Sequence, residues 1–309
     1  MIEAGAVSKR YGEKVAVDDL TFTVRPGAVT GFLGPNGAGK STTIRMIMGL
    51  DAPTSGTVTV NGKRYDRHVA PLREVGALLE AKAVHTGRSA YNHLLALALT
   101  TGIPRRRVDE VIGLVGLADV AGKRVGGFSL GMGQRLGVAA ALLGDPATLV
   151  LDEPVNGLDP QGILWIRKLL RELAAEGRTV LVSSHLLSEM ALTAEHLIVI
   201  GKGRLIAETS VSEFIGRASG NAVRVRTARA ADLRDLLTGP DVSVTSVEPD
   251  LLEVSGRSSA EIGRIACDGS IPLEELVPVQ ASLEEAFMEL TDDALEYRVV
   301  EAAQERRVS

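Results

Sequence analysis

An eight-residue glycine-rich segment, Gly34-Pro-Asn-Gly-Ala-Gly-Lys-Ser41, constrains the fold of this chain more than any other feature. It follows a short apolar run at 29–33 and precedes a segment of helical character that Gly49 can cap. A strand, a tight glycine loop and a helix in this order are typical of an α/β fold in which the loop wraps around phosphate oxygens. The sequence therefore predicts a phosphate-binding loop.

The chemistry expected of this loop follows from its residue types. Glycines let successive backbone N–H groups point inward, Lys40 can reach the β- and γ-phosphates, and the Ser41 hydroxyl can ligate Mg²⁺. A glycine-rich turn that matches by chance is the alternative, and the flanking strand and helix argue against it. The residues expected to contact nucleotide here are Gly34, Pro35, Asn36, Gly37, Ala38, Gly39, Lys40, Ser41 and Thr42.

A pair of acids follows a second apolar run. Residues 148–151 form a predicted buried strand, and Asp152 and Glu153 come directly after it. Open α/β sheets bind ligands at the carboxyl ends of their strands, so this pair is expected to face the same ligand as the phosphate loop. Asp152 suits Mg²⁺, and Glu153 suits orientation of an attacking water. A strand that merely ends in two acids is the alternative.

Composition excludes several classes of protein. The formal net charge is -5, whereas general nucleic-acid binders carry a basic excess. The single cysteine, Cys267, cannot form an internal disulfide, and the N-terminus lacks the apolar region of a signal peptide. The longest apolar runs fall far below the ~20 residues that cross a bilayer. We expect a soluble, cytosolic chain that does not bind nucleic acid.

The charges also divide the chain into two expected domains. Residues 1–216 carry 24 basic and 21 acidic side chains, whereas residues 217–309 carry 10 Arg, 18 acids and no lysine. The stretch 216–220, Gly-Arg-Ala-Ser-Gly, is the predicted joint. Beyond it, the patterns favour the order β-α-β-β-α-β, which suggests a small ferredoxin-like α+β domain.

The first expected domain, 1–216, has an α/β pattern. Strands are predicted around Leu20, Phe22 and Val24 and over 57–60, 149–151 and 180–182, and a helix is predicted over 160–176. Residues 89–143 are mostly helical by pattern and lie between strands, which predicts an inserted helical subdomain.

Three motifs together resemble those of ABC-type (ATP-binding cassette) ATPases. Gly34–Ser41 and Leu149–Glu153 resemble the Walker A and Walker B motifs, and Phe128-Ser-Leu-Gly-Met132 resembles the family signature, whose form is L-S-G-G-Q. Membership implies a RecA-like core with an antiparallel β subdomain and an inserted helical subdomain. Leu130 and Met132 depart from the pattern.

The retained signature residues are Ser129 and Gly131. Ser129 can cap the helix that follows, and Gly131 leaves room for a γ-phosphate at its N-terminus. In the family, nucleotide bound at Lys40 and Ser41 of one subunit is completed by this serine and glycine of another. The resemblance therefore implies a homodimer that binds ATP and Mg²⁺ between its subunits.

Further residues match the family in order. Asp159, in Asn156-Gly-Leu-Asp159, resembles the D-loop, and His185 resembles the switch histidine at the γ-phosphate. Tyr11 matches the aromatic residue that stacks on adenine, and Val17 is expected near the ribose. The alternative for Tyr11 is a loop tyrosine without a role in binding. A single histidine is usually packed or solvated, so the role of His185 rests on its position in the motif order.

Glu80 stands where the family usually places a glutamine. A glutamate there brings a full charge to Mg²⁺ and resembles the variant loop of some bacterial exporters linked to peptide-antibiotic resistance. It is equally a surface acid if the alignment is shifted by one residue. A second resemblance to antibiotic exporters lies near the C-terminus, in Leu283-Glu-Glu-Ala-Phe287.

The resemblance thus implies an ATPase subunit of an ABC exporter for drug, antibiotic or peptide-like cargo. Such a subunit works with a separate integral-membrane permease, on the inner face of the cell membrane. Three alternatives stay open: a non-transport ABC ATPase of repair or translation, an ABC importer ATPase, and a regulatory module that holds ATP without hydrolysis.

Overall fold

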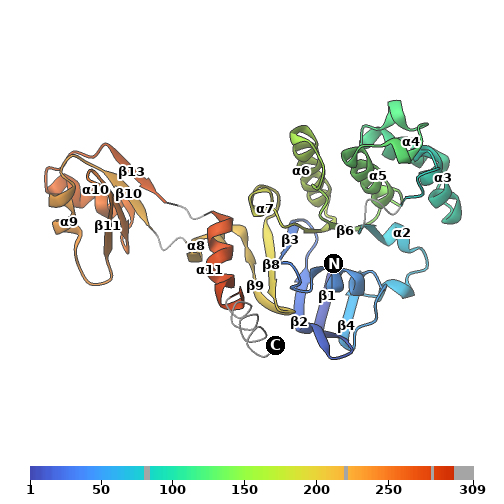
Figure 1. Cartoon of the computed structure of the whole chain (residues 1–309), viewed down its shortest axis with the longest axis horizontal. Coiled ribbons are helices and arrows are strands. Elements are labelled where there is room, and N and C mark those ends of the chain that lie inside the picture. The colour runs from blue at the N-terminus through green and yellow to red at the C-terminus, as the bar shows by residue number, and fades with distance from the viewer. Residues whose placement is uncertain (80–83, 219–221, 280–281, 296–309) are drawn as a thin grey trace, which may run out of the picture. The chain divides into compact units, whose positions relative to one another are not determined.

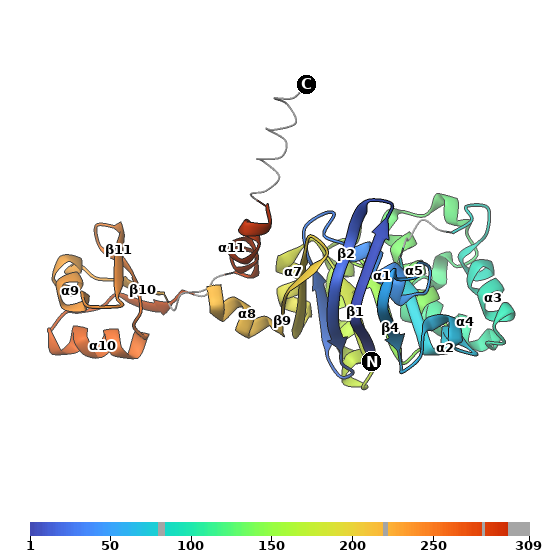
Figure 2. The same ribbon diagram turned by 90° about the horizontal axis from the view of Figure 1, so that it is seen from below.

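The computed structural model describes residues 1–79, 84–218, 222–279 and 282–295. The chain forms two compact units, Met1–Ser210 and Val211–Ser309, whose elements are labelled in Figures 1 and 2. Helix α8 (Val211–Ala218) covers the first residues of the joint predicted at 216–220. The observed boundary lies between Ser210 and Val211, a few residues before the predicted joint. Residues 219 and 220 lie outside the described residues.

A six-stranded sheet forms the centre of the first unit. Its order is β5-β6-β7-β3-β8-β9, and the first five strands are parallel while β9 is antiparallel. The strands are β3 (Val29–Leu33), β5 (Val75–Leu78), β6 (Thr148–Asp152), β7 (Thr179–Ser183), β8 (His196–Gly201) and β9 (Arg204–Ser210). The strands predicted over 29–33, 149–151 and 180–182 are confirmed. Because β3, β6 and β7 are parallel neighbours, their carboxyl ends meet at one edge.

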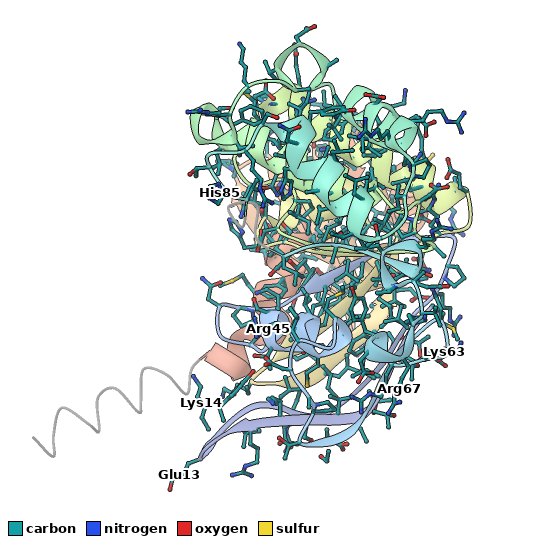
Figure 3. All side chains as sticks on the ribbon, turned by 90° about the vertical axis from the view of Figure 1, so that its right-hand side faces the viewer. Glu13, Lys14, Arg45, Lys63, Arg67 and His85 are labelled. Carbon is teal, nitrogen blue, oxygen red and sulfur yellow. The ribbon has the colours of Figure 1, made fainter. Side chains whose placement is uncertain are left out.

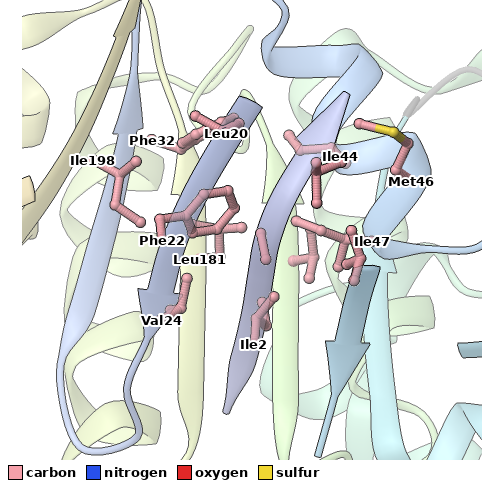
Figure 4. Packing of buried hydrophobic residues seen from close by; sticks show 14 of the residues in the cluster. Ile2, Leu20, Phe22, Val24, Phe32, Ile44, Met46, Ile47, Leu181 and Ile198 are labelled. Carbon is pink, nitrogen blue, oxygen red and sulfur yellow. The ribbon is translucent and has the colours of Figure 1, made fainter. Parts of the chain in front are cut away.

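A three-stranded antiparallel sheet covers one side of this core. Its order is β2-β1-β4, from β1 (Ile2–Tyr11), β2 (Lys14–Val24) and β4 (Ser55–Val60). Helix α1 (Lys40–Ile47) contributes to the same hydrophobic cluster, in which Phe22 of β2 and Phe32 of β3 lie with ring centroids 5.7 Å apart (Figure 4). The predicted antiparallel subdomain is confirmed.

Helices make up the rest of the first unit. The inserted helical subdomain is confirmed and contains α3 (Ala90–Thr100), α4 (Arg105–Leu114) and α5 (Leu130–Leu142). The others are α2 (Pro71–Glu74), α6 (Pro160–Ala175) and α7 (Leu187–Thr193). A Cβ on Gly76 of β5 would lie 1.9 Å from the carbonyl oxygen of Ala141, so only glycine allows α5 to approach the sheet this closely.

The second unit contains a ferredoxin-like sheet with the strand order β11-β12-β10-β13. Its elements are β10 (Val223–Arg226), α9 (Ala230–Leu237), β11 (Ser243–Glu248), β12 (Leu251–Ser255), α10 (Ser259–Asp268) and β13 (Glu275–Pro278), followed by α11 (Leu283–Leu295). The predicted order β-α-β-β-α-β is confirmed. Apolar side chains of α9 and α10 pack on one face of the sheet, with Leu233, Leu252 and Ile262 fully buried.

Within the described residues, none of the helices combines the length and the apolar character that a membrane crossing requires.

Candidate active site

The phosphate loop lies between β3 and α1, as the sequence predicts. Gly37 and Gly39 have φ values of 82° and 104°, in the left-handed region that favours glycine. A Cβ on Gly39 would lie 2.6 Å from the carbonyl oxygen of Ala16, so no larger residue fits. The loop is therefore built around glycine for two separate reasons, backbone conformation and close packing.

Lys40 is held inside this loop. Its Nζ donates hydrogen bonds to the carbonyl oxygens of Gly34 and of Pro35, the latter at 3.2 Å. Burial lowers the pKa of Lys40, and the nearby charges of Glu153 and Asp152 oppose that shift. Lys40 is 9% exposed, and both of these hydrogen bonds join its ammonium to a neutral carbonyl oxygen. An anionic phosphate is a stronger partner for such a cation than a carbonyl group.

A cavity of about 360 Å³ opens over the loop. It brings together half of the predicted site residues, and its lining consists of Tyr11, Lys14, Ala16, Asn36, Gly37, Gly39, Lys40, Ser41, Thr42, Asp152 and Glu153. Sequence reasoning missed Lys14, which Figure 3 shows beside Glu13 at the turn between β1 and β2. Val17 is fully buried and packs beneath Gly39, so Ala16 rather than Val17 faces the cavity.

Both carboxylates lie at the end of β6, next to the end of β7. The Ser183 hydroxyl donates a hydrogen bond to Asp152 and accepts one of 3.0 Å from the Glu153 backbone N–H. Burial raises the pKa of Asp152, and the hydrogen bond from Ser183 opposes that rise. A cation would stabilise the ionised form of this half-buried carboxylate, and the Ser41 hydroxyl on the same cavity wall supplies a second oxygen donor.

These two oxygen donors fit Mg²⁺, which takes few protein ligands and keeps several waters. No group of three or more His, Cys, Asp or Glu side chains among the described residues is arranged to hold a metal by itself. Glu80, the third expected metal ligand, lies outside the described residues. Its role stays a prediction.

Glu153 has an unusual backbone conformation for a residue with a side chain. Its φ is 51°, in the left-handed region. The backbone N–H reaches both the carbonyl oxygen of Ser183, at 3.2 Å, and the Ser183 hydroxyl. Its side chain accepts a 2.7 Å hydrogen bond from Nδ1 of His185. The structure therefore brings His185 to the acid pair, although His185 itself does not line the cavity.

Tyr11 is fixed by a network that sequence reasoning missed. Its hydroxyl donates a 2.7 Å hydrogen bond to Asp51, and Arg45 of α1 pairs with the same carboxylate at 2.7 Å. The ammonium of Lys9 lies 5.0 Å from the centre of the Tyr11 ring. Tyr11 is 47% exposed and lines the cavity, so its ring offers an aromatic surface to a planar ligand.

The signature residues lie together at the start of α5. The Ser129 hydroxyl caps the helix by accepting a 3.2 Å hydrogen bond from the Met132 N–H, as predicted. A Cβ on Gly131 would lie 2.9 Å from the carbonyl oxygen of Gly157, and the Leu130 side chain fills the space over Gly157. Ser129 and Gly131 are not among the cavity's lining residues.

Asp159 follows Gly157 by two residues. Its side chain caps α6 by accepting a 2.9 Å hydrogen bond from the Gly162 N–H, and it does not line the cavity. The nucleotide contact expected of Asp159 stays a prediction.

Gln134 is another residue to which sequence reasoning assigned no role. It lies on α5, 4% exposed, and its Nε2 donates a 2.9 Å hydrogen bond to the backbone carbonyl of Glu153. The signature helix and the acid pair are therefore joined within one chain. The only sequence signal was its position in Gly133-Gln-Arg135, directly after the signature.

The chain is similar to known proteins over most of its length. The model of the ABC transporter family matches residues 17–156. The chain is 36% identical to the uncharacterized ABC transporter ATP-binding protein YhcH of Bacillus subtilis, over 96% of this chain and 97% of that protein. The chain belongs to the ABC transporter ATP-binding proteins. This ABC chain is also 44% identical to the bacitracin transport ATP-binding protein BcrA of Bacillus licheniformis, over 67% of this chain and 69% of the relative.

The fold of this ABC protein agrees with solved structures. The ATP-binding subunit of an ABC transporter superposes with a TM-score of 0.64 and 28% identity, covering 70% of this chain and 92% of the other. A separate model, a domain of unknown function, matches residues 221–284. The match to the ABC family model thus falls in the first unit, and the second unit contains a different domain.

Proposed function

We propose that this chain hydrolyses ATP as the nucleotide-binding subunit of an ABC exporter. The observation that carries the proposal is the cavity in which Lys40 and Ser41 lie with Asp152 and Glu153. A phosphate loop beside two carboxylates supplies both parts of phosphoryl transfer, charge stabilisation and orientation of the nucleophile. The contact between Glu153 and His185 supports a hydrolytic role over ATP binding alone.

The roles follow from position. Lys40 exchanges its carbonyl partners for the β- and γ-phosphates, and the loop N–H groups bind the same oxygens. Ser41 and Asp152 would hold Mg²⁺, which would supply positive charge to stabilise the phosphates of the nucleotide. Glu153 orients the attacking water, and His185 orients Glu153 and reaches toward the γ-phosphate. Tyr11 stacks on the adenine.

The same proposal includes a head-to-tail homodimer. Ser129 is exposed and Gly131 is half-buried at the N-terminus of α5, and neither lines the described cavity of its own chain. A second copy that presents this end of α5 to the cavity completes the site with a hydroxyl and backbone N–H groups. Two nucleotides then join two chains.

Cargo and membrane partner are the last part of the proposal. The relative BcrA is named for bacitracin transport, and a 35% identical relative of Streptococcus pyogenes, SrtF, is named for lantibiotic transport. Both cargos are peptide antibiotics, so we assign this chain to export of that class through a separate permease. An adjacent open reading frame with several apolar spans of about 20 residues, and antibiotic sensitivity after deletion of both genes, would support this part.

The ATPase part is tested with Glu153→Gln. Removal of the carboxylate should lower kcat by about 10²–10⁴ while MgATP still binds, so the variant accumulates as an ATP-bound dimer. Light scattering after gel filtration measures the dimer, and phosphate release measures turnover. Glu172→Gln, at an exposed site on α6, is the matched control and should behave as wild type. A Glu153→Gln chain that stays monomeric in saturating MgATP contradicts the dimer.

A non-transport role makes a different prediction. A repair or translation ATPase of this family would bind nucleic acid tightly and with strong salt dependence. Gel filtration of the wild-type chain with DNA or RNA at two salt concentrations separates this outcome from the exporter.

A further inference from the structure

We infer that Gln134 is a positioning residue, which ties the catalytic Glu153 to the signature end of helix α5 in the same chain. The inference rests on the proposed function, since it concerns how one ATP site senses the other. The signature end of α5 is proposed to touch nucleotide held by a second copy, whereas Glu153 acts on nucleotide held by its own chain. Gln134 connects the two.

The bond itself is specific. Gln134 is 4% exposed, and its Nε2 lies 2.9 Å from the carbonyl oxygen of Glu153. Buried amide donors are rarely left without a partner, because an unsatisfied group costs about 1–3 kcal/mol. Gln134 follows the cap residue Ser129 by little more than one helical turn, so both belong to the same rigid segment of α5.

Glu153 needs such support. Its φ of 51° is a conformation that a residue with a side chain adopts at a cost and retains only when its surroundings determine it. Ser183 holds the N–H from one side. On the other side, the Glu153 carbonyl accepts from Gln134 and, at 3.2 Å, from the Asn156 N–H. The bond from Gln134 is the one that comes from the helical subdomain.

A displacement of α5 is therefore passed to the catalytic carboxylate. Nucleotide bound by Ser129 and Gly131 favours one position of this helix end, and Gln134 carries that preference to the Glu153 backbone. A misplacement of about 1 Å in a catalytic group can cost about 10²-fold in rate. Each chain thus hydrolyses efficiently only when its own signature end is engaged, and the two sites become cooperative.

The test compares two neighbouring substitutions on α5. Gln134→Met keeps an unbranched side chain of similar length but removes the donor to Glu153. Arg135→Met is the matched control, because it removes a 3.0 Å hydrogen bond from Nη1 to the Val115 carbonyl and a stacking contact with Trp165, neither of which involves Glu153. Melting curves establish that both variants are folded.

The expected result separates positioning from stability. In Gln134→Met, kcat falls about 10–100-fold, MgATP affinity under non-hydrolysing conditions changes less than about threefold, and the Hill coefficient falls from near two toward one. In Arg135→Met the Hill coefficient stays at the wild-type value. In Gln134→Asn the shorter side chain cannot reach the Glu153 carbonyl, so kcat and the Hill coefficient should fall in the same way. This variant replaces Gln134→Met in the test if Gln134→Met does not fold.

Three outcomes overturn the inference. The first is a folded Gln134 variant with wild-type kcat and Hill coefficient, and the second is an equal loss of cooperativity in Arg135→Met. The third is a wild-type Hill coefficient near one, which contradicts the coupling but leaves the ATPase function intact. Absence of ATP hydrolysis by the wild-type chain contradicts the proposed function instead.

Discussion

Oε2 of Glu153 lies 2.7 Å from Nδ1 of His185, and these two side chains come from segments that are 32 residues apart in the sequence. The contact joins the end of β6 to the turn after β7, which are parallel neighbours in the sheet. It orients the carboxylate that the proposed mechanism uses, because a hydrogen bond to one oxygen limits rotation of the whole group.

His185→Ala should therefore reduce turnover rather than binding. We expect kcat to fall about 10²–10³-fold, because the carboxylate loses its orienting partner, and KM for ATP to change much less. His196→Ala, at an exposed position of β8, serves as the control. Steady-state phosphate release measures both parameters. An equal effect of the two substitutions, or a change confined to KM, contradicts the assigned role of His185.

The bond between Tyr11 and Asp51 leads to a prediction about the base of the nucleotide. Tyr11→Phe keeps the ring and removes the hydroxyl, and Asp51→Asn removes the carboxylate that Tyr11 and Arg45 share. Each should weaken ATP binding about fivefold, since one hydrogen bond contributes about 1 kcal/mol. The variant that combines both substitutions should bind ATP as tightly as Asp51→Asn alone. Binding of tripolyphosphate, which has no base, should stay unchanged.

The pH dependence of this bond has a definite sign. Hydrogen bonds from Arg45 and then Tyr11 lower the pKa of Asp51 to about 2 from 3.8. A lowered pKa means that the ionised carboxylate stabilises the folded network above pH 3.8, and that this contribution is lost as the pH falls toward 2. The difference in the free energy of unfolding between wild type and Asp51→Asn should therefore be constant from about pH 5 to pH 8. Asp66→Asn, at an exposed acid paired with Arg64, is the control.

Ser183 and Ser184 offer a comparison within one strand end. Ser183→Ala removes the hydroxyl that contacts both Asp152 and the Glu153 N–H, whereas Ser184→Ala removes a 3.0 Å bond to the Leu186 N–H. Each substitution should lower the free energy of unfolding by about 1–2 kcal/mol. Only Ser183→Ala should also lower kcat, by about tenfold, and Ser183→Thr should restore it. Denaturant unfolding with parallel turnover assays distinguishes the two.

The local parts of this structure could be predicted from the sequence. The strand over 29–33, the loop over 34–41 and the cap by Ser129 depend on neighbouring residues, so pattern and residue type suffice. The ferredoxin-like order in the second unit could be predicted for the same reason. Strand β1 was missed because Ala6, with φ of 50°, lies in a bulge that interrupts the alternation of apolar residues.

The contacts that organise the site could not be predicted in this way. Tyr11 and Asp51 are 40 residues apart, and Gln134 and Glu153 are 19 apart, so each pair meets only through the tertiary fold. Helix α8 was missed because Gly216 suggested a joint, yet a Cβ at Gly216 would meet nothing within 4 Å. Glycine there weakens the helix without ending it.

The second unit provides a last prediction, on stability. Leu252 is fully buried beneath α9 and α10, so Leu252→Ala should lower the free energy of unfolding of this unit by about 2–5 kcal/mol. Leu236→Ala, at a leucine of α9 that is 50% exposed, should cost less than about 0.5 kcal/mol. MgATP binds the first unit in the proposed function, and at 100-fold excess over its Kd it should stabilise that unit by about 2.7 kcal/mol. Calorimetry of the full chain should then show two transitions, of which Leu252→Ala lowers one and MgATP raises the other. A single transition that responds to both would show that the two units unfold together.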